Sequence, residues 1–295
     1  MGSLEGRVAI ITGAGRGIGR EHALLFAAEG AKIVVNDLGG ANDGTGSDLT
    51  PAQEVVAEIE AMGGQAIVNG DNVADWEGGQ RLVNSAIEAF GDLDILVNNA
   101  GILRDRVLVN MTEEEWDAVI AVHLKGHFVP TRWAAAYWRE QHKAGVTKPR
   151  NIVHTSSTSG LFSNPGQSNY GAAKSGIATF NQIVAKELSR YNVKSNCIAP
   201  GARTRLTLAT PGLDQVIAAP EDEGTFDIWD PANISPLVAY LSSADCAFTG
   251  ETFFVQGGNV TKFESWALGS KVEQNDRWTV SALAEALAPL AATED

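Results

Sequence analysis

The sequence contains little cysteine and no long hydrophobic run, and both absences narrow its possible classes. Its two cysteines, Cys197 and Cys246, are too few for a disulfide framework or a four-ligand zinc site. We therefore predict no metal site and expect a reducing, cytoplasmic location. No stretch of about 18 apolar residues could span a bilayer. Residues 1–6 also lack the basic-then-apolar layout of a signal peptide.

Positive charge is also scarce in this chain of 295 residues. It has 22 lysines and arginines against 36 aspartates and glutamates, which gives a formal net charge of -14. Binding to a nucleic-acid backbone needs a basic surface, and so does docking on an anionic membrane. We therefore exclude nucleic acids and membrane surfaces as partners and expect a small-molecule substrate.

What the sequence does contain is a regular alternation of short apolar runs and helical patterns. Seven runs are predicted to be strands: 8–12, 32–37, 65–68, 94–98, 151–155, 193–199 and 251–256. Helices are predicted between them over 18–29, 51–62, 76–90, 168–190 and 231–241, with Thr50 as the N-cap of the second. Thr112 and Glu115 form a capping-box pattern, which predicts the start of a further long helix.

This alternation predicts an α/β fold of the Rossmann type, a doubly wound parallel sheet of about seven strands with helices on both faces. No linker-like or low-complexity segment divides the chain, so we expect a single domain over 1–295. Residues 203–230 have no clear period and are predicted to form a loop or lid over the substrate. Residues 260–295 are predicted to be a C-terminal extension with a short helix over 281–290.

A glycine-rich turn lies between the first predicted strand and the helix that follows it. Gly13, Gly17 and Gly19 would let the backbone turn sharply and approach a pyrophosphate at the helix N-terminus. Arg16 and Ile18 lie in the same turn. The pattern predicts a dinucleotide-binding site, and the alternative is a turn with a purely structural role.

Asp37 ends the second predicted strand, where a carboxylate can accept both ribose hydroxyls of the adenosine and repel a 2′-phosphate. This position favours NAD over NADP as the cofactor. Arg16 argues for the opposite choice, because a basic side chain in the turn could hold that phosphate. Asp71 and Asn72 follow the third strand and are candidate adenine contacts, and the alternative for them is a simple Asx-turn.

Tyr170 and Lys174 are four residues apart in a predicted helix, so their side chains lie on one helical face. A free tyrosine, with a pKa of about 10, exchanges protons poorly at neutral pH. A nearby ammonium group would stabilise the phenolate and lower that pKa. Ser157 follows the fifth strand and could hydrogen-bond a substrate oxygen. Alone, this spacing indicates a solvated helix face; together with the glycine turn it predicts proton transfer.

Several motifs occur together in this sequence: Thr12-Gly13-x-x-x-Gly17-x-Gly19, Asn98-Asn99-Ala100-Gly101, Ser157, Tyr170-x-x-x-Lys174 and Pro200-Gly201. In this combination the chain resembles the short-chain dehydrogenase/reductase family from about residue 6 to 260. Residues 35–40, 98–106, 122–126 and 166–170 further resemble the (3R)-hydroxyacyl-CoA dehydrogenase unit of peroxisomal multifunctional enzymes of type 2. They also resemble stand-alone actinobacterial relatives of that unit, some of which are associated with steroid degradation.

The resemblance implies a role for each matching residue. Ser157 would orient the carbonyl or alcohol, Tyr170 would transfer the proton, and Lys174 would lower the pKa of Tyr170 and bind the nicotinamide ribose. Further cofactor contacts that it implies are Asn99, Ala100, Gly101, Pro200, Gly201, Ala202 and Thr204. It also implies a homodimer or homotetramer built on the helices after the fourth and fifth strands.

Two departures from the family pattern stand out. Where this chain has His123, many members of the family have an asparagine. The backbone carbonyl of that asparagine anchors a water molecule for proton relay. A backbone carbonyl survives the change of side chain, so the relay could persist; the alternative is a helix residue satisfied by its neighbours. The sequence also shows no hydratase or sterol-carrier domain and no peroxisomal Ser-Lys-Leu ending.

These observations predict an NAD-dependent oxidoreductase that interconverts a secondary alcohol and a ketone, with a 3-hydroxyacyl-CoA or steroid-derived CoA thioester as substrate. Arginines after the fourth and sixth strands could attract the polyanionic coenzyme A unless nearby acids pair with them: Arg104, Arg106, Arg203 and Arg205. Apolar lid residues could cover an acyl or ring system: Leu206, Leu208, Leu213, Val216, Ile217, Phe226 and Trp229. The alternatives are a hydroxysteroid dehydrogenase, an NADP-linked ketone or 3-oxoacyl reductase and, in a different class, a nucleotide-sensing or scaffolding protein.

Overall fold

A sheet of eight strands runs through the computed structural model, which describes residues 2–208, 217–220, 222, 224–264 and 266–291. The strands are β1 (Val8–Thr12), β2 (Lys32–Asn36), β3 (Gln65–Asn69), β4 (Ile95–Asn98), β5 (Arg150–Thr155), β6 (Val193–Pro200), β7 (Thr252–Gln256) and β8 (Asn259–Lys262). Their order in the sheet is β3-β2-β1-β4-β5-β6-β7-β8. Neighbouring strands are parallel up to β7, and β8 is antiparallel to β7.

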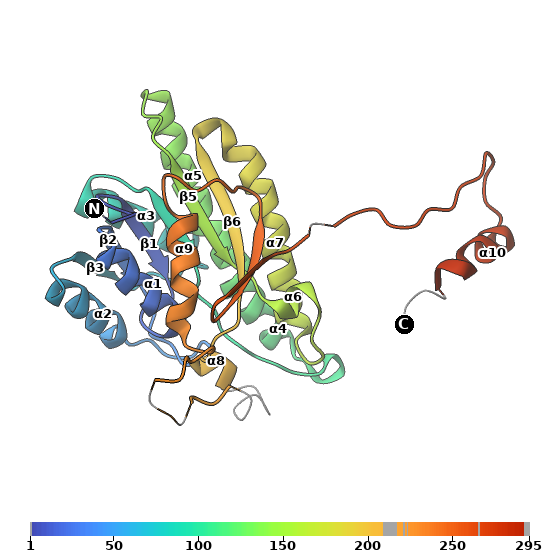
Figure 1. Cartoon of the computed structure of the whole chain (residues 1–295), viewed down its shortest axis with the longest axis horizontal. Coiled ribbons are helices and arrows are strands. Elements are labelled where there is room, and N and C mark those ends of the chain that lie inside the picture. The colour runs from blue at the N-terminus through green and yellow to red at the C-terminus, as the bar shows by residue number, and fades with distance from the viewer. Residues whose placement is uncertain (1, 209–216, 221, 223, 265, 292–295) are drawn as a thin grey trace. The chain divides into compact units, whose positions relative to one another are not determined.

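Helices cover both faces of this sheet (Figure 1). One face carries α1 (Gly17–Ala28), α2 (Thr50–Ala61) and α9 (Ser235–Leu241), and the other carries α3 (Trp76–Phe90), α5 (Gly126–Lys143) and α7 (Ser168–Leu188). The shorter helices α4 (Glu113–Ile120), α6 (Thr158–Leu161) and α8 (Arg205–Leu208) follow β4, β5 and β6. Because both faces are covered, β1 and β4 are buried along their whole length, which explains their continuous apolar runs.

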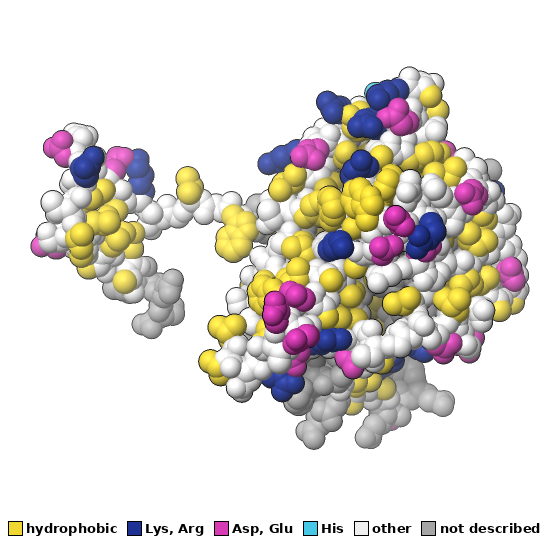
Figure 2. Space-filling model, turned by 180° about the vertical axis from the view of Figure 1, so that it is seen from behind, with side chains coloured by type: hydrophobic (Ala, Val, Ile, Leu, Met, Phe, Trp, Pro, Cys, Tyr) yellow, Lys and Arg dark blue, Asp and Glu magenta, His cyan; other side chains and the backbone are white. Residues whose placement is uncertain are grey.

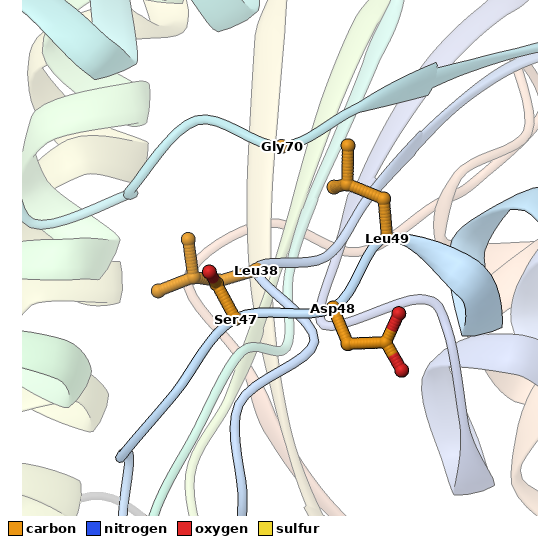
Figure 3. A pocket seen from close by; sticks show the side chains of 5 residues that line it. All are labelled: Leu38, Ser47, Asp48, Leu49 and Gly70. Atoms are coloured by element: carbon orange, nitrogen blue, oxygen red, sulfur yellow. The ribbon is translucent and has the colours of Figure 1, made fainter.

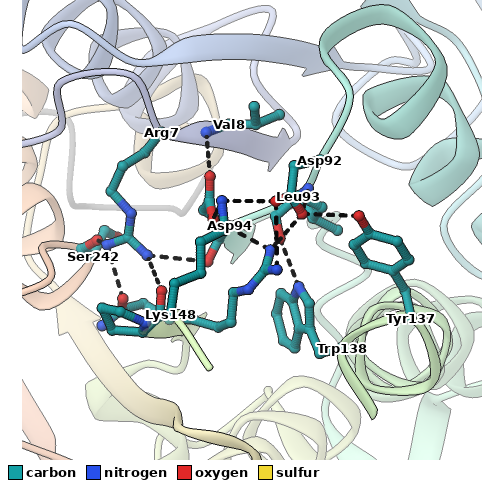
Figure 4. Close-up of polar contacts among 12 residues, drawn as sticks. Arg7, Val8, Asp92, Leu93, Asp94, Tyr137, Trp138, Lys148 and Ser242 are labelled. Atoms are coloured by element: carbon teal, nitrogen blue, oxygen red, sulfur yellow. Dashed lines mark hydrogen bonds and ion pairs between the residues drawn. The ribbon is translucent and has the colours of Figure 1, made fainter. Parts of the chain in front are cut away.

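A network of partly buried ion pairs crosslinks the amino ends of the central strands (Figure 4). Nη1 of Arg150 lies 2.6 Å from Asp92 and 3.2 Å from Asp94, and Nζ of Lys148 lies 2.7 and 2.6 Å from the same two carboxylates. Arg7, just before β1, donates to backbone carbonyls of neighbouring segments. This end of the sheet is therefore closed by structural contacts, and the loops at the carboxyl end remain for a ligand site.

The predicted doubly wound parallel sheet is confirmed, and β8 is the strand that the sequence did not reveal. β8 pairs with β7 across the two-residue turn Gly257-Gly258, in which Gly257 has a φ angle of 52°. A Gly-Gly pair between two strands is a hairpin signal. The residues of β8 are all exposed, however, so they give no apolar run to accompany it.

Two differences from the predicted helices have a local structural cause. α2 begins at Thr50 itself, and the carboxylate of Asp48 accepts the Thr50 N–H at 2.9 Å, so the prediction of Thr50 as N-cap was wrong. The expected capping box of Thr112 and Glu115 is present, but the helix after it is divided. α4 ends at Ile120, and a π-helical turn over Ala121–Lys125 leads into α5. A π turn adds a residue to the backbone repeat, which hydrophobic periodicity does not reveal.

The chain divides into a body over residues 1–263 and a second compact unit over residues 264–295. The boundary falls within the expected C-terminal extension. The second unit contains α10 (Val280–Ala291), close to the helix predicted over 281–290. Of the helices in the described part of the chain, none is long and apolar enough to cross a membrane.

Candidate active site

The glycine turn joins β1 to α1 at the carboxyl end of the sheet. Gly13 and Gly17 have φ angles of 65° and 54°, which glycine adopts without strain. A Cβ atom on Gly13 would lie 2.8 Å from the Cα atom of Ala100, and one on Gly19 would lie 2.1 Å from the carbonyl oxygen of Gly13. The glycines are therefore required by the close approach of the turn to the loop after β4 and by its own curvature.

Asn99 fastens this turn to the end of β4. Its side-chain amide donates to the carbonyls of Thr12 and Gly13 at 3.1 and 3.3 Å. The Thr12 hydroxyl in turn accepts the backbone N–H groups of Asn99 and Ala100 at 2.9 and 3.1 Å. Arg16 occupies the N-cap of α1 without capping it through its side chain. The first N–H groups of α1, around Ile18, therefore have no side-chain cap from Arg16, which leaves them suited to a pyrophosphate.

Asp37 follows β2 and accepts backbone N–H groups from two loops. Its Oδ2 atom accepts from Gly15 at 2.8 Å, and its Oδ1 atom accepts from Gly39 at 2.6 Å. Burial and the charge of Arg16 lower the pKa of Arg205, whereas Asp37 acts in the opposite direction. The carboxylate therefore lies against the glycine turn, and the guanidinium of Arg205 is within its electrostatic range.

A cavity of ≈ 220 Å³ lies beyond the carboxyl ends of β2 and β3 (Figure 3), and it is lined by Leu38, Ser47, Asp48, Leu49 and Gly70. Asp71 and Asn72 follow Gly70 directly. The carboxylate of Asp71 accepts from Arg81 at 2.7 Å. The side chain of Asn72 accepts the Ala74 N–H at 2.9 Å, which is the Asx-turn considered as its alternative. Asp71 and Asn72 thus lie next to the cavity, and each side chain already has a protein partner.

The long loop between β2 and α2 extends from Asp37 to the loops after β4 and β6. The carbonyl of Asn42 accepts from Leu103 at 3.0 Å, and its side chain donates to the carbonyl of Arg205 at 3.1 Å. Arg104 donates to the carbonyl of Asp43 at 2.9 Å. Three loops that are far apart in the sequence therefore meet at the carboxyl end of the sheet.

Ser157, Tyr170 and Lys174 come together at the carboxyl end of β5. Ser157 precedes α6, and its hydroxyl hydrogen-bonds to that of Tyr170. Lys174 lies one turn further along α7 and is 2% exposed. Its Nζ atom donates to the carbonyl of Thr155 at 2.6 Å and lies 5.4 Å from the centroid of the Tyr170 ring. The structure thus brings the three predicted catalytic residues into one group.

Burial dominates the ionisation of this group. Burial raises the pKa of Tyr170 to about 12, with the hydrogen bond from Ser157 acting against it and the charge of Asp105 adding to it. Burial also lowers the pKa of Lys174 to about 7. Both shifts oppose the expected effect of Lys174 on Tyr170, because they favour a neutral amine beside a protonated phenol. Any interaction that keeps Lys174 in its charged ammonium form therefore affects how readily Tyr170 transfers a proton.

His123 packs against Tyr170, with ring centroids 5.0 Å apart and planes at 89°. Its Nε2 atom donates to the carbonyl of Ile102 at 2.7 Å. The ring fills the space above Gly101, where a Cβ atom would lie 2.5 Å from Cε1 of His123. Burial, followed by the charge of Lys174, lowers the pKa of His123 to about 3, so the imidazole is neutral. Its neighbours satisfy only Nε2, because Nδ1 has no partner among the described residues.

The loop after β6 returns towards the glycine turn. β6 ends at Pro200, and the N–H of Gly201 donates to a carbonyl of β7 at 2.8 Å. Ala202 is buried, and a methyl group of Thr204 lies 3.5 Å from the position that a Cβ atom on Gly17 would take. These residues therefore lie beside the glycine turn, and their contact with the nicotinamide stays a prediction.

The arginines expected to attract the substrate have different surroundings. Arg106 forms an ion pair with Glu115 at 2.7 Å, and Arg203 forms one with Asp227. For Arg106 and Arg203 the structure therefore confirms the alternative that nearby acids pair with these arginines. Arg104 donates to the backbone carbonyls of Asp43 and Glu114 at 2.9 and 3.4 Å. Within the described part of the chain, the guanidinium of Arg205 has no hydrogen-bond acceptor, so it remains available to an anion.

The apolar lid expected over 203–230 is described in part. Leu213 and Val216 lie outside the described residues. Ile217 is buried, whereas Leu208 and Phe226 are exposed by 46% and 60%. Exposed apolar side chains are therefore present where a substrate cover was expected.

A family model described as short chain dehydrogenase matches residues 7–210. The chain is 44% identical over 266 residues to the hydroxyacyl-CoA dehydrogenase ChsB1 of Mycobacterium tuberculosis, covering 88% of this chain and 80% of that protein. It is also 44% identical over 258 residues to the peroxisomal multifunctional enzyme type 2 of Drosophila melanogaster. That match covers 88% of this chain but 40% of the longer Drosophila protein.

Similarity to a solved structure extends over nearly the whole chain. The crystal structure of a short chain dehydrogenase from Mycobacterium avium matches with a TM-score of 0.84 and 49% sequence identity. The match covers 99% of this chain and 95% of the Mycobacterium avium chain. The glycine turn and the group of Ser157, Tyr170 and Lys174 therefore lie on a fold that this chain shares with a solved short chain dehydrogenase.

Proposed function

Because the chain belongs to the short-chain dehydrogenase family and is an oxidoreductase, we propose that it interconverts a secondary alcohol and a ketone with NAD as its cofactor. The observation that carries the proposal is the group of Ser157, Tyr170 and Lys174 beside an open glycine turn. When bound, the nicotinamide would exchange a hydride with the carbon atom that bears the substrate oxygen. Hydride transfer on adding cofactor and substrate, followed at the reduced-nicotinamide absorbance, tests this reaction directly.

Three residues of this chain would bind the substrate oxygen and transfer its proton. The Ser157 hydroxyl holds that oxygen beside the Tyr170 hydroxyl, to which it already bonds. Tyr170 donates its proton to the developing alkoxide during reduction and accepts the alcohol proton during oxidation. Lys174, as an ammonium group, favours the phenolate form of Tyr170 and so lowers the barrier to that transfer.

The carboxyl end of the sheet fits a dinucleotide. The uncapped N–H groups at the start of α1 suit the pyrophosphate, because they are donors at the positive end of the helix dipole. Asp37 suits the adenosine ribose, because its carboxylate lies at the end of β2 next to Gly15. The cavity walls at Leu38 and Leu49 suit the apolar faces of a purine ring.

We expect NAD to bind more tightly than NADP, because the charge of Asp37 repels a 2′-phosphate. Asp37→Asn keeps the size of the side chain and removes its charge. It should weaken NAD binding by about tenfold, because a charged hydrogen bond is lost, and strengthen NADP binding, since Arg16 and Arg205 lie nearby. The dissociation constants of both reduced cofactors, measured by fluorescence titration, check this expectation.

Asp43→Asn is the matched control, because Asp43 lies in the same loop and, among the described residues, its side chain hydrogen-bonds Thr45 alone. It should leave both constants unchanged. A wild-type protein that prefers NADP would contradict the assignment and would show that Arg16 and Arg205 outweigh Asp37.

For the substrate we propose a 3-hydroxyacyl-CoA or a steroid-derived CoA thioester. The names of the relatives support this class, and so do the exposed apolar residues of the lid and Arg205, whose guanidinium has no acceptor among the described residues. We expect kcat/KM to be at least about tenfold higher for a CoA ester than for the same acyl group on a short pantetheine thioester. Arg205→Ala should remove most of that difference.

Arg139→Ala is the control for this comparison, because Arg139 is exposed and its one ion pair in the described part of the chain is with Glu140 on its own helix. Equal kcat/KM values for the two thioesters, unchanged by Arg205→Ala, would contradict the CoA substrate. Turnover of a neutral hydroxysteroid in that case would favour the hydroxysteroid dehydrogenase alternative.

We also propose that the protein forms a homodimer or homotetramer through the outer faces of α5 and α7. Figure 2 shows hydrophobic side chains gathered on the side of the molecule opposite to that seen in Figure 1. Phe128 of α5 and Ile183 of α7 are exposed by 42% and 47%. The Phe128 ring also contacts Trp76, which is 42% exposed, and Phe180, at centroid distances of 6.1 and 6.3 Å. An exposed aromatic group of this kind is typical of a protein interface.

A further inference from the structure

The start of α7 is joined to the loop after β4 by contacts to which the proposed reaction gives no task. The N–H of Arg106 donates to the carbonyl of Gly166 at 2.8 Å. The side-chain amide of Gln167 donates to Oδ2 of Asp105 at 2.7 Å. Two segments that are far apart in the sequence therefore meet where α7 begins.

Asn169 lies at the centre of this junction and is fully buried. Its Nδ2 atom donates to the backbone carbonyls of Arg104 and Glu115 at 3.0 and 3.1 Å. Its Oδ1 atom accepts the backbone N–H of Tyr170 at 2.7 Å. These partners fix the orientation of the amide, because the two carbonyl oxygens can only accept and the N–H can only donate. One side chain thus joins the loop after β4, helix α4 and the first turn of α7.

The backbone N–H of Tyr170 needs an acceptor outside the ladder of helical hydrogen bonds. α7 begins at Ser168, so Tyr170 is its third residue, and the first four N–H groups of a helix have no acceptor within it. Gln167 occupies the N-cap position, but its side chain does not cap the helix. Asn169 supplies the acceptor from within the first turn, and its amide donors hold the same turn to the loop.

The loop after β4 also holds the side chain of Tyr170, through His123. The two rings pack edge to face with their centroids 5.0 Å apart, and Nε2 of His123 donates to the carbonyl of Ile102 at 2.7 Å. Ile102 and Arg104 belong to the same loop. Tyr170 is therefore held from this loop at two points, at its ring through His123 and at its backbone through Asn169.

The two hydroxyl groups that bind the substrate oxygen in the proposed reaction come from different elements. Ser157 lies between β5 and α6, whereas Tyr170 lies in the first turn of α7. Their side chains are hydrogen-bonded to each other. The distance between the two hydroxyls therefore depends on where the first turn of α7 is seated.

We propose that Asn169 is a positioning residue, which fixes the first turn of α7 to the loop after β4 and thereby holds the Tyr170 hydroxyl against that of Ser157. The inference rests on the proposed function, because it gives Tyr170 the proton transfer. Without the Asn169 amide, the carbonyls of Arg104 and Glu115 lose a donor and the Tyr170 N–H loses its acceptor, so the turn separates from the loop. A misplacement of about 1 Å in a reacting group can cost about 100-fold in rate.

The first test is the steady-state kinetics of Asn169→Ala in the full chain. We expect kcat to fall by about 10- to 100-fold, whereas the dissociation constant of the reduced cofactor should not change. Asn181→Ala is the matched control, because Asn181 is also a fully buried asparagine of α7. Its amide donates to the carbonyl of Glu251 at 3.1 Å and accepts from the Ser195 hydroxyl at 2.8 Å. This control should lower stability but leave kcat of the folded protein unchanged.

A double-mutant cycle shows whether Asn169 acts through the Tyr170 hydroxyl. In the Tyr170→Phe background, Asn169→Ala should change the residual kcat by less than about twofold, because the hydroxyl that it positions is absent. A purely structural role would lower kcat by the same factor in both backgrounds and would overturn the proposal. An unchanged kcat in folded Asn169→Ala would overturn it as well.

Asn169→Asp separates the two tasks of the side chain. It keeps an oxygen for the Tyr170 N–H but places a second oxygen against the carbonyls of Arg104 and Glu115. We expect it to lose as much kcat as Asn169→Ala. Wild-type kcat in this variant would show that only the acceptor matters and would overturn the tie to the loop.

Amide hydrogen exchange tests the tie without cofactor or substrate. The Arg106 N–H donates to Gly166 and not to Asn169, so its exchange reports how firmly the two segments are joined. We expect this exchange to be about tenfold faster in Asn169→Ala and unchanged in Asn181→Ala. The wild-type exchange rate in Asn169→Ala would overturn the tie. An inactive protein that shows the faster exchange would remove the proposed function and leave the tie in place.

Gln167→Ala serves if Asn169→Ala does not fold. It removes the hydrogen bond to Asp105, which joins the same two segments. We expect kcat to fall by about three- to tenfold, which corresponds to the loss of one hydrogen bond. Wild-type values of both kcat and the Arg106 exchange rate in this variant would overturn the proposal.

Discussion

At the scale of single residues, the proposed proton transfer depends on the hydroxyl of Tyr170. Tyr170→Phe removes that hydroxyl but keeps the ring against His123. We expect kcat to fall by about 100- to 10,000-fold, because a general acid–base group contributes this much. The dissociation constant for the cofactor should stay close to the wild-type value. Steady-state kinetics and fluorescence titration measure the two quantities.

Tyr240→Phe is the control for this substitution, because Tyr240 is 40% exposed on α9. It should leave both quantities unchanged. Lys174→Ala should damage both cofactor binding and rate, since the proposal gives this residue both tasks. Full activity of the Tyr170→Phe protein would end the proposed mechanism.

At the scale of elements, the exposed faces of α5 and α7 decide the state of association. Phe128→Asp places a charge in the centre of the aromatic group formed with Trp76 and Phe180. We expect it to shift the protein to a smaller species, because a buried unpaired charge in an interface is costly. Light scattering after size-exclusion chromatography measures the mass.

Met62→Asp is the control for association, because Met62 is 55% exposed at the end of α2, on the opposite face of the sheet. It should leave the mass unchanged. A wild-type protein that runs as a monomer would contradict the proposed assembly, and equal dissociation by the two variants would place the interface elsewhere.

Most elements that carry the candidate site could be predicted because each has a local pattern. The helix predicted over 76–90 matches α3, and the glycine turn lies between β1 and α1 as expected. Elements that depend on distant contacts could not be predicted. The ion pair of Arg203 involves Asp227, which lies 24 residues along the chain, and the sequence does not tell which acid an arginine meets.

The residues of the candidate site divide in the same way, into those that belong to a local motif and those that meet only through distant contacts. Ser157, Tyr170 and Lys174 could be found because their spacing belongs to a family motif. The stacked pair of His127 and His154, whose ring centroids lie 5.6 Å apart, could not, since it joins helix α5 to strand β5 and neither residue has a motif of its own.

At the scale of the whole molecule, the ion pairs at the amino end of the sheet make stability depend on pH. Burial opposes the ionisation of Asp92, but hydrogen bonds from Arg150 and Lys148 outweigh it and lower its pKa from 3.8 to about 2. A carboxyl group with a lowered pKa in the folded state contributes stability that is present above the unfolded value. This stability is lost as the pH falls from about 4 to about 2.

Asp92→Asn should therefore lower the free energy of unfolding by about 2 kcal/mol at pH 7, and the difference from the wild type should shrink below about pH 4. Urea unfolding over a pH series measures it. Glu140→Gln is the control, because the ion pairs of Glu140 with Arg139 and Lys143 are exposed and should contribute below about 1 kcal/mol. A loss in Asp92→Asn that does not change with pH would contradict the role assigned to the charge.

The antiparallel strand β8 has a consequence for the protein at high concentration. An edge strand offers unpaired N–H and C=O groups to which a strand of another molecule can add, and long flat edges are therefore sites of aggregation. After the Gly257-Gly258 turn, the sheet ends in a strand of four exposed residues that closes on Lys262. A short edge with a charged side chain gives a foreign strand little to pair with. The hairpin therefore protects the buried strand β7 from edge-to-edge fibril growth, a task separate from catalysis.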